Sequence, residues 1–118
     1  MDEAIAIHER LIEKFGGAPG IRDKGLLESA LYRPQTGYYD DLAELAAAMF
    51  QSLLMNHAFL DGNKRAAFFV TDTFLRLNGW KLIVDAASAH NVIVGMLKAG
   101  ECSFEKILSW IKESLEKS

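Results

Sequence analysis

The fold of this chain is decided by residues 57–65, HAFLDGNKR, a dense polar segment between two apolar ones. Residues 42–56 before it and residues 66–77 after it carry so little charge that each is expected to form a largely buried helix. Two buried helices would therefore hold one polar loop. This loop supplies an imidazole, a carboxylate, a carboxamide, an ammonium and a guanidinium group. That set of groups suits a phosphate-bearing ligand.

The second half of this segment has the properties of an anion site. A helix N-terminus presents unpaired backbone N–H groups and a partial positive charge, and both favour phosphate. Gly62 allows the backbone to approach a ligand closely or to turn with a positive φ. Lys64 and Arg65 add positive charge where the helix dipole disfavours it, and we interpret this placement as a sign of anion binding.

Asp61 and His57 supply a metal ligand and a base. Magnesium is commonly held by one or two carboxylates together with the phosphates of its ligand, so Asp61 is the predicted magnesium ligand. An imidazole titrates near neutral pH and can accept a proton there, so His57 is the predicted general base. The segment thus contains the groups that a phosphate chemistry requires.

A purely structural interpretation of the same segment uses the same residues. Phe59 is expected to anchor the loop in the core in either case. Asn63 would cap the following helix, and Lys64 and Arg65 would be solvated. Each residue alone favours this interpretation, whereas their order and spacing together favour a functional site.

The segment resembles the signature of the Fic/Doc family, His-x-Phe-x-(Asp/Glu)-(Gly/Ala)-Asn-(Gly/Lys)-Arg, with every fixed position filled. The Fic branch transfers AMP to protein hydroxyls and has Gly before the Arg and a second Arg three residues after it. This chain has Lys64 and Phe68 at those positions. Both departures match the death-on-curing (Doc) branch, the toxin half of a toxin–antitoxin pair. The resemblance extends through KFGGAPGIRD (residues 14–23) and GLLESALYRPQ (residues 25–35) and covers nearly the whole chain.

The resemblance to Doc implies a toxin that transfers the γ-phosphate of ATP to a protein hydroxyl, with translation elongation factor Tu as the target class. ATP and Mg²⁺ are therefore the expected cofactors. His57 would deprotonate the hydroxyl, and Asp61 would hold the metal. Four consecutive residues would bind the phosphates, the last two also neutralising developing charge: Gly62, Asn63, Lys64 and Arg65. Two alternatives stay open, namely Fic-type AMP transfer and a catalytically silent module that binds a partner.

The resemblance also bears on inhibition. Self-inhibited Fic proteins carry a helix reading Ser/Thr-x-x-x-Glu-(Gly/Asn), whose Glu pairs with the second Arg of the motif. Here Ser109-x-x-x-Glu113-Ser114 fails at its last position, and Phe68 replaces the Arg. We interpret this stretch as helix surface. Inhibition is then expected from an antitoxin whose disordered segment folds on binding, as in the Doc branch.

Composition agrees with one small domain spanning residues 1–118. Half of the residues are hydrophobic and only two are Pro, which suits a helical protein. The net charge of −3 argues against direct nucleic-acid binding. Cys102 is the single cysteine and is expected to be half-buried and unreactive. The chain shows neither a secretory signal nor an apolar run of membrane-spanning length, so a cytoplasmic location is expected.

The remaining sequence predicts further helices around the central pair. Residues 80–84 are expected to be extended, the one β-like piece, and Asp72 and Arg76 to pair on the polar face of a helix. The expected architecture is an all-α bundle of about six helices. The predicted helices are residues 2–15 ended by Gly16 and Gly17, 24–32 capped by Asp23, 42–56 opened by Asp41-x-x-Glu44, 66–77, 85–98 ended by Gly100, and 103 to about 115.

Some side chains receive only a structural interpretation. His8 lies on the apolar stripe of the first helix, with Ile5, Ile12 and Phe15 on one side, and is interpreted as a packing residue. His90 is expected to be solvated. Residues 33–40 are predicted to be a loop, which by resemblance would be the flap that positions the main chain of the target. The alternative is that its two tyrosines, Tyr38 and Tyr39, cover the edge of the core.

Overall fold

The computed structural model describes residues 2–37 and 39–118, and within them the chain forms six α-helices, one 3-10 helix and two short strands. The elements in chain order are α1 (Asp2–Phe15), α2 (Lys24–Tyr32), η1 (Arg33–Thr36), α3 (Leu42–Asn56), α4 (Asn63–Leu77), β1 (Trp80–Leu82), α5 (Ala86–Ala99), α6 (Phe104–Ser114) and β2 (Leu115–Lys117). The predicted all-α class is confirmed.

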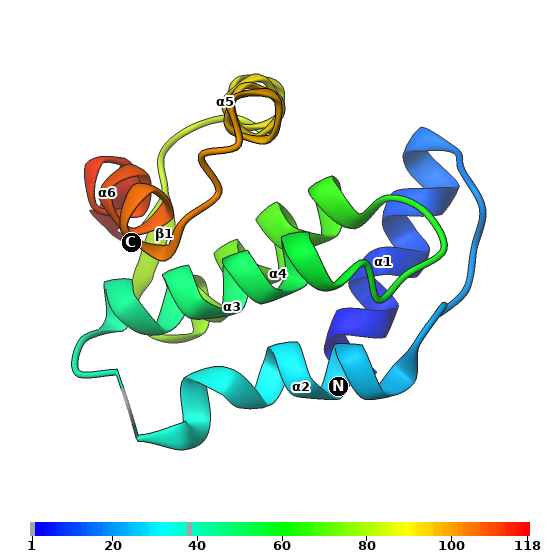
Figure 1. Cartoon of the computed structure of the whole chain (residues 1–118), viewed down its shortest axis with the longest axis horizontal. Coiled ribbons are helices and arrows are strands. Elements are labelled where there is room, and N and C mark those ends of the chain that lie inside the picture. Colours follow the sequence, from blue (N-terminus) through cyan, green and yellow to red (C-terminus); the bar gives the residue numbers. More distant parts are fainter. Residues whose placement is uncertain (1, 38) are drawn as a thin grey trace.

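Helices α3 and α4 form the centre of the fold (Figure 1). Helix α3 packs against α2, α4 and α6, while α4 packs against α1, α5 and β1. Five consecutive residues of α3, residues 46–50, are all buried because neighbouring elements surround the helix. Three of these five are alanines, whose small side chains let the helices approach closely. The loop that joins the two helices lies beside α1 (Figure 1), and this loop is the polar segment of residues 57–65.

Side-chain caps set the start of four helices, and those of Asp23 and Asp41 are the predicted ones. Asp23 and Asp41 each accept a hydrogen bond from the backbone N–H three residues further on. Asp85 and Ser103 do the same at α5 and α6. Gly100 ends α5 with a φ of 68°. Because these caps satisfy N–H groups that the helix itself leaves unpaired, they fix the helix boundaries locally.

Three segments differ from the predicted structure. Helix α4 begins at Asn63, three residues before the predicted start at residue 66. Residues 33–36 form a 3-10 helix rather than a loop, because Pro34 stands in its first turn, where no N–H donor is needed. The last helix ends at Ser114, and Leu115–Lys117 forms β2, which pairs antiparallel with β1. The prediction that residues 80–84 are extended is right for Trp80–Leu82, but the prediction that they are the one β-like piece is wrong.

The buried face of α1 also differs from the predicted one. Ala4, His8 and Leu11 are the buried residues of this helix. Phe15 at its end is 44% exposed, so it does not belong to the core. The imidazole of His8, only 2% exposed, lies at the centre of the face that α1 presents to α4.

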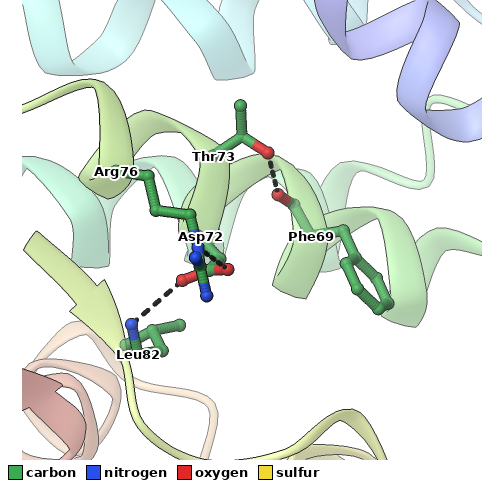
Figure 2. A network of polar contacts seen from close by, with 5 residues as sticks. All are labelled: Phe69, Asp72, Thr73, Arg76 and Leu82. Atoms are coloured by element: carbon green, nitrogen blue, oxygen red, sulfur yellow. Dashed lines mark hydrogen bonds and ion pairs between the residues drawn. The ribbon is translucent and has the colours of Figure 1, made fainter. Parts of the chain in front are cut away.

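Asp72 connects the end of α4 to β1 (Figure 2). Its carboxylate accepts hydrogen bonds from Nε of Arg76 at 2.7 Å and from the backbone N–H of Leu82 at 2.9 Å. The predicted pairing of Asp72 with Arg76 is confirmed. The second bond was not predicted, and it fixes the direction in which the chain leaves α4 toward α5.

Two expectations from composition concern Cys102 and membrane spans. Cys102 is partly buried, and burial raises the pKa of its thiol, which agrees with an unreactive cysteine. No helix among the described residues combines the length and the apolarity needed to cross a bilayer.

Candidate functional site

The polar segment is a tight loop between two left-handed residues. His57 ends α3 with φ 50° and ψ 50°, and Gly62 precedes α4 with φ 74°. Between them, Phe59 is 1% exposed and its ring stacks on that of His8, with centroids 3.9 Å apart and planes 7° apart. The expectation that Phe59 anchors the loop is confirmed.

Asn63 closes this loop from inside. Its Oδ1 accepts a hydrogen bond from the N–H of Phe59 at 3.1 Å, and its Nδ2 donates to the carbonyl of Phe59 at 3.0 Å. The predicted alternative, in which Asn63 caps the following helix, is therefore wrong: the cap position is Gly62, which has no side chain to bond the helix N-terminus. The first N–H groups of α4 lie beside the loop without a side-chain cap.

Residues 16–23 hold the loop from outside. The guanidinium group of Arg22 donates to the carbonyls of His57 at 2.6 Å and Asn56 at 2.9 Å. The backbone N–H groups of Arg22 and Asp23 both donate to the carbonyl of Ala58, at 2.7 Å and 3.0 Å. Three successive carbonyls at the end of α3 are thus bound by one short stretch, and a short antiparallel bridge pairs residue 21 with residue 59.

His57 is the one residue other than glycine with a positive φ in the part of the chain that the structure describes. Such a conformation is unfavourable for a residue with a Cβ atom, by about 1–2 kcal/mol. The two hydrogen bonds from Arg22 at this point offset that cost. The left-handed turn directs the chain away from the α3 axis, and the exposed side chain of His57 lines a cavity.

The carboxylate of Asp61 is fixed by two backbone N–H donors. Gly62 donates to its Oδ1 at 2.8 Å and Ala18 to its Oδ2 at 3.3 Å. The hydrogen bond from Gly62 lowers the pKa of Asp61 most, followed by the bond from Ala18, with smaller contributions from the charges of His8 and Lys64. The carboxylate is therefore anionic at neutral pH.

Gly17 permits this arrangement. A Cβ atom on Gly17 would lie 2.7 Å from Oδ2 of Asp61, and the φ of Gly17 is 113°. Only glycine adopts this conformation readily and leaves room for the carboxylate. The glycines of residues 16–20, interpreted from sequence as turn residues, thus also bring a backbone donor to Asp61.

All six predicted site residues line one cavity of about 330 Å³. Helix α5 forms the opposite wall through His90 and Leu97. His90 is exposed, as predicted, but it is also part of this cavity. The predicted residues are His57, Asp61, Gly62, Asn63, Lys64 and Arg65.

A second cavity of about 420 Å³ adjoins the first, and Lys64, Arg65 and His90 line both. The guanidinium group of Arg65 stacks on the ring of Phe15, 4.3 Å from its centroid, which holds Arg65 at the boundary between the cavities. Phe68 lines the second cavity and is 6% exposed. The position at which the Fic signature has a second Arg is thus a buried aromatic residue.

The donor set fits magnesium better than a permanently bound transition metal. No group of three or more His, Cys, Asp or Glu side chains in residues 2–37 and 39–118 is placed to hold a metal ion. Asp61 is the one carboxylate among the residues that line the cavity. Magnesium that arrives with phosphate oxygens and water needs no more than one or two carboxylates.

Sequence reasoning missed His8 and Arg22 as parts of the site. His8 lies 53 residues from Asp61, and its Nε2 is 2.7 Å from the carbonyl oxygen of Asp61. Arg22 lies 35 residues from His57. The KFGGAPGIRD stretch that contains Arg22 was the available signal, because four glycines and prolines in five residues indicate a built turn.

The segment proposed as a flap is tied to the core at Tyr39. Nε of Arg33 donates to the hydroxyl of Tyr39 at 2.7 Å, and the Tyr39 ring lies 5.5 Å from that of Phe104. Tyr39 thus covers the edge of the core, which is the second of the two interpretations. Tyr38 lies outside the described residues.

The fold and the loop together define the Fic/DOC family, and this family matches residues 1–75. The chain belongs to the Fic/DOC family. Among similar proteins, "Toxin Doc" of Mycolicibacterium smegmatis is 50% identical over 76 residues, which cover 60% of this chain and 58% of that protein. "Protein kinase doc" of Escherichia phage P1 is 32% identical over 115 residues, which cover 94% of this chain and 90% of that protein. The match thus spans less than two thirds of the mycobacterial relative.

Proposed function

We propose that this protein is the toxin of a toxin–antitoxin pair and transfers the γ-phosphate of ATP to a hydroxyl of a protein target, with translation elongation factor Tu as the expected target. The observation that carries the proposal is the single cavity lined by His57, Asp61 and Lys64 at the start of α4. The groups proposed as the base, the metal ligand and the phosphate-binding helix start line it together. Two similar proteins named as a Doc toxin and a Doc protein kinase support it.

Each group has a role that its position supports. The exposed imidazole of His57 accepts the proton of the incoming hydroxyl. The uncapped N-terminus of α4 and the side chains of Lys64 and Arg65 bind the phosphates and neutralise charge that develops during transfer. Asn63 acts indirectly, because its amide holds the loop closed.

Magnesium and ATP fit the site through Asp61. The carboxylate is anionic and held by two N–H groups, so it is oriented before a ligand arrives. Magnesium, when bound with the nucleotide, would offset the negative charge of the phosphates. Asp61→Asn is expected to weaken the magnesium-dependent part of nucleotide binding, measured by calorimetry with and without EDTA, while the helices remain folded.

The decisive experiment uses ATP labelled separately at the α and γ positions. The purified chain is incubated with Mg²⁺, each labelled ATP, and either purified elongation factor Tu or a bacterial lysate. Transfer of the γ label only is the expected result, with mass spectrometry showing the addition of one phosphate. The His57→Ala variant, treated in the same way, controls for contaminating kinases.

The other outcomes separate the remaining readings. Transfer of the α label would identify AMP transfer, for which the structure offers less support because Phe68 stands where the Fic signature has its second Arg. No transfer of either label, together with nucleotide-independent binding of a partner, would identify a silent binding module. Labelling of a lysate protein other than elongation factor Tu would uphold the reaction and replace the target.

A further inference from the structure

His8 is a buried imidazole directly beneath the motif loop, and the proposed reaction gives it no part. It lies on α1, and its Nε2 is 2.7 Å from the carbonyl oxygen of Asp61. Because a carbonyl can only accept, Nε2 carries the proton and donates it. The face of the imidazole ring stacks on the ring of Phe59, with the two centroids 3.9 Å apart. The imidazole therefore contacts the motif loop in two ways, through a hydrogen bond to Asp61 and through stacking on Phe59.

The hydrogen bond from His8 fixes a peptide plane. The carbonyl of Asp61 and the N–H of Gly62 belong to the same planar peptide group and point in opposite directions. With the carbonyl turned inward to His8, the N–H turns outward and donates to Oδ1 of Asp61 at 2.8 Å. One bond inside the protein thus orients one of the two N–H groups that hold the Asp61 carboxylate at the surface of the cavity.

Gly62 allows His8 to come this close. A Cβ atom on Gly62 would lie 3.6 Å from Nε2 of His8 and 3.4 Å from Cδ1 of Ile12. Gly62 thus lies directly against the side chains of His8 and Ile12 in α1. Helix α1 acts as a support for the loop, with His8 as its one hydrogen-bonding group toward Asp61 among the described residues.

His8 does not act on a ligand directly. It is 2% exposed, and it is absent from the residues that line either cavity next to the motif. A direct catalytic role would require contact with the reacting atoms. Any effect of His8 on the reaction must therefore pass through the loop residues beside it, Phe59, Asp61 and Gly62.

We propose that His8 is a positioning residue, whose hydrogen bond to the Asp61 carbonyl presents the Asp61 carboxylate to a magnesium ion that arrives with nucleotide phosphates. The metal role of Asp61 rests on the proposed function, whereas the orientation of the carboxylate by His8 does not. In other proteins, partners that orient a metal ligand change metal affinity by about 10–100-fold when they are removed.

Three substitutions separate the hydrogen bond from the packing. His8→Phe keeps a ring that can stack on Phe59 but removes the donor. His8→Gln keeps an N–H donor at a similar reach and removes the ring. Leu11→Val, on the same buried face of α1, loosens the helix without touching the bond and serves as the matched control. His8→Met is used in place of His8→Phe if the latter does not fold.

The first measurement needs no ligand. The amide protons of Gly62 and Ala18, which donate to the Asp61 carboxylate, are followed by NMR in the free protein. His8→Phe is expected to shift both resonances toward those of amides without this bond, while His8→Gln and Leu11→Val leave them near the native positions. Unshifted amides in His8→Phe would show that His8 does not orient Asp61, and the proposal would be overturned.

The second measurement uses the non-hydrolysable ATP analogue AMP-PNP and calorimetry in Mg²⁺ and in EDTA. His8→Phe is expected to weaken binding by about 10–100-fold in Mg²⁺ with little change in EDTA, and His8→Gln to recover most of the affinity. Equal weakening in both conditions, or none in either, would overturn the proposal. If the native protein itself shows no magnesium-dependent binding, the proposed function fails, and the amide resonances still decide whether His8 orients Asp61.

Discussion

At the scale of single residues, the backbone of His57 matters as much as its imidazole. Its left-handed conformation carries the chain out of α3, and the guanidinium group of Arg22 donates to the carbonyls of Asn56 and His57, one on each side of the His57 Cα atom. A strained conformation of this kind persists where surrounding contacts fix it, and such conformations are concentrated at functional sites. Here the contacts come from a loop that also binds Asp61.

His57→Ala is expected to lower phosphate transfer by a factor of about 10² to 10⁴, the usual loss when a general base is removed. Growth arrest on expression should disappear as well, while circular dichroism stays native. The matched control is His90→Ala, which removes the other imidazole of the same cavity and should lower phosphate transfer far less. Equal losses for the two variants, or a fully active His57→Ala, would contradict the assignment of the base.

Lys64 is the residue that best separates phosphate transfer from AMP transfer. Its side chain lines the cavity, where a glycine would leave more room. We propose that the charge of Lys64 favours a pose with the γ-phosphate nearest His57. A difference of about 1.4 kcal/mol between two poses changes their ratio tenfold. Lys64→Gly should therefore lose γ-phosphate transfer and show weak AMP transfer, assayed with the two labelled forms of ATP. Undiminished γ-phosphate transfer would mean that Lys64 does not select the pose.

At the scale of elements, the glycine-rich stretch between α1 and α2 is a part of the site rather than a simple connection. Gly17→Ala would place a Cβ atom 2.7 Å from the Asp61 carboxylate in a conformation that suits glycine. We expect a loss of unfolding free energy of about 1–2 kcal/mol, measured by urea denaturation, together with weaker magnesium-dependent nucleotide binding. Gly16→Ala, where a Cβ atom meets nothing within 4 Å, carries similar backbone strain and should spare the binding. Identical binding losses in both variants would show that strain alone is responsible.

The N-terminal cap of α5 should make stability depend on acid pH. Hydrogen bonds from the backbone and side chain of Ser88 hold the pKa of Asp85 below its ordinary value of 3.8. Because the native state binds this proton less readily than the unfolded chain, the contribution of the cap is complete above that ordinary value and is lost as the pH falls through the lowered one. Urea denaturation should show that Asp85→Asn has a lower unfolding free energy than the native chain near neutral pH. This difference in unfolding free energy (the gap) should become smaller in acid. Asp40→Asn, at an exposed position, should show a smaller gap. A gap that stayed constant with pH would exclude this linkage.

The sequence predicts what is local and misses what is distant. The starts of α2, α3, α5 and α6 follow from the cap residue that directly precedes each helix. The caps of α2 and α3 agree with the prediction, and the starts of α5 and α6 lie within one residue of the predicted ones. The six cavity residues were predicted to form a site because they are nearly contiguous. From the sequence, His8 is interpreted as a packing residue, because a histidine on an apolar helix face gives no sign of the loop that it supports. The sequence predicts that the last helix continues to about residue 115 and does not predict strand β2, because the extended form of β2 depends on pairing with β1.

At the scale of the whole molecule, the proposed toxin should be inhibited by a separate antitoxin. A segment that binds the native state alone stabilises it by about 2.7 kcal/mol at a hundredfold excess over its Kd, so the melting temperature should rise with antitoxin concentration. Hydrogen exchange of the amides of residues 57–65 should slow in the complex if the segment docks near the motif. Free expression without growth arrest, in cells that encode no partner beside it, would count against the toxin assignment.

The support of the motif loop by α1 also sets how the protein should respond to warming. The hydrogen bonds from His8 and Ala18 to Asp61 join residues that are 53 and 43 positions apart. The backbone hydrogen bonds of a helix, in contrast, join residues four positions apart. Helix α1 meets the rest of the fold mainly through α4. We therefore expect α1 to detach in a partial opening that leaves the α3–α4 pair intact, which hydrogen exchange of the α1 amides would test. Such an opening would release the Asp61 carboxylate while most of the helix content remains. Phosphate-transfer activity should therefore decrease reversibly at temperatures below the main melting transition. The N-terminal helix would then be the least heat-stable element of the protein.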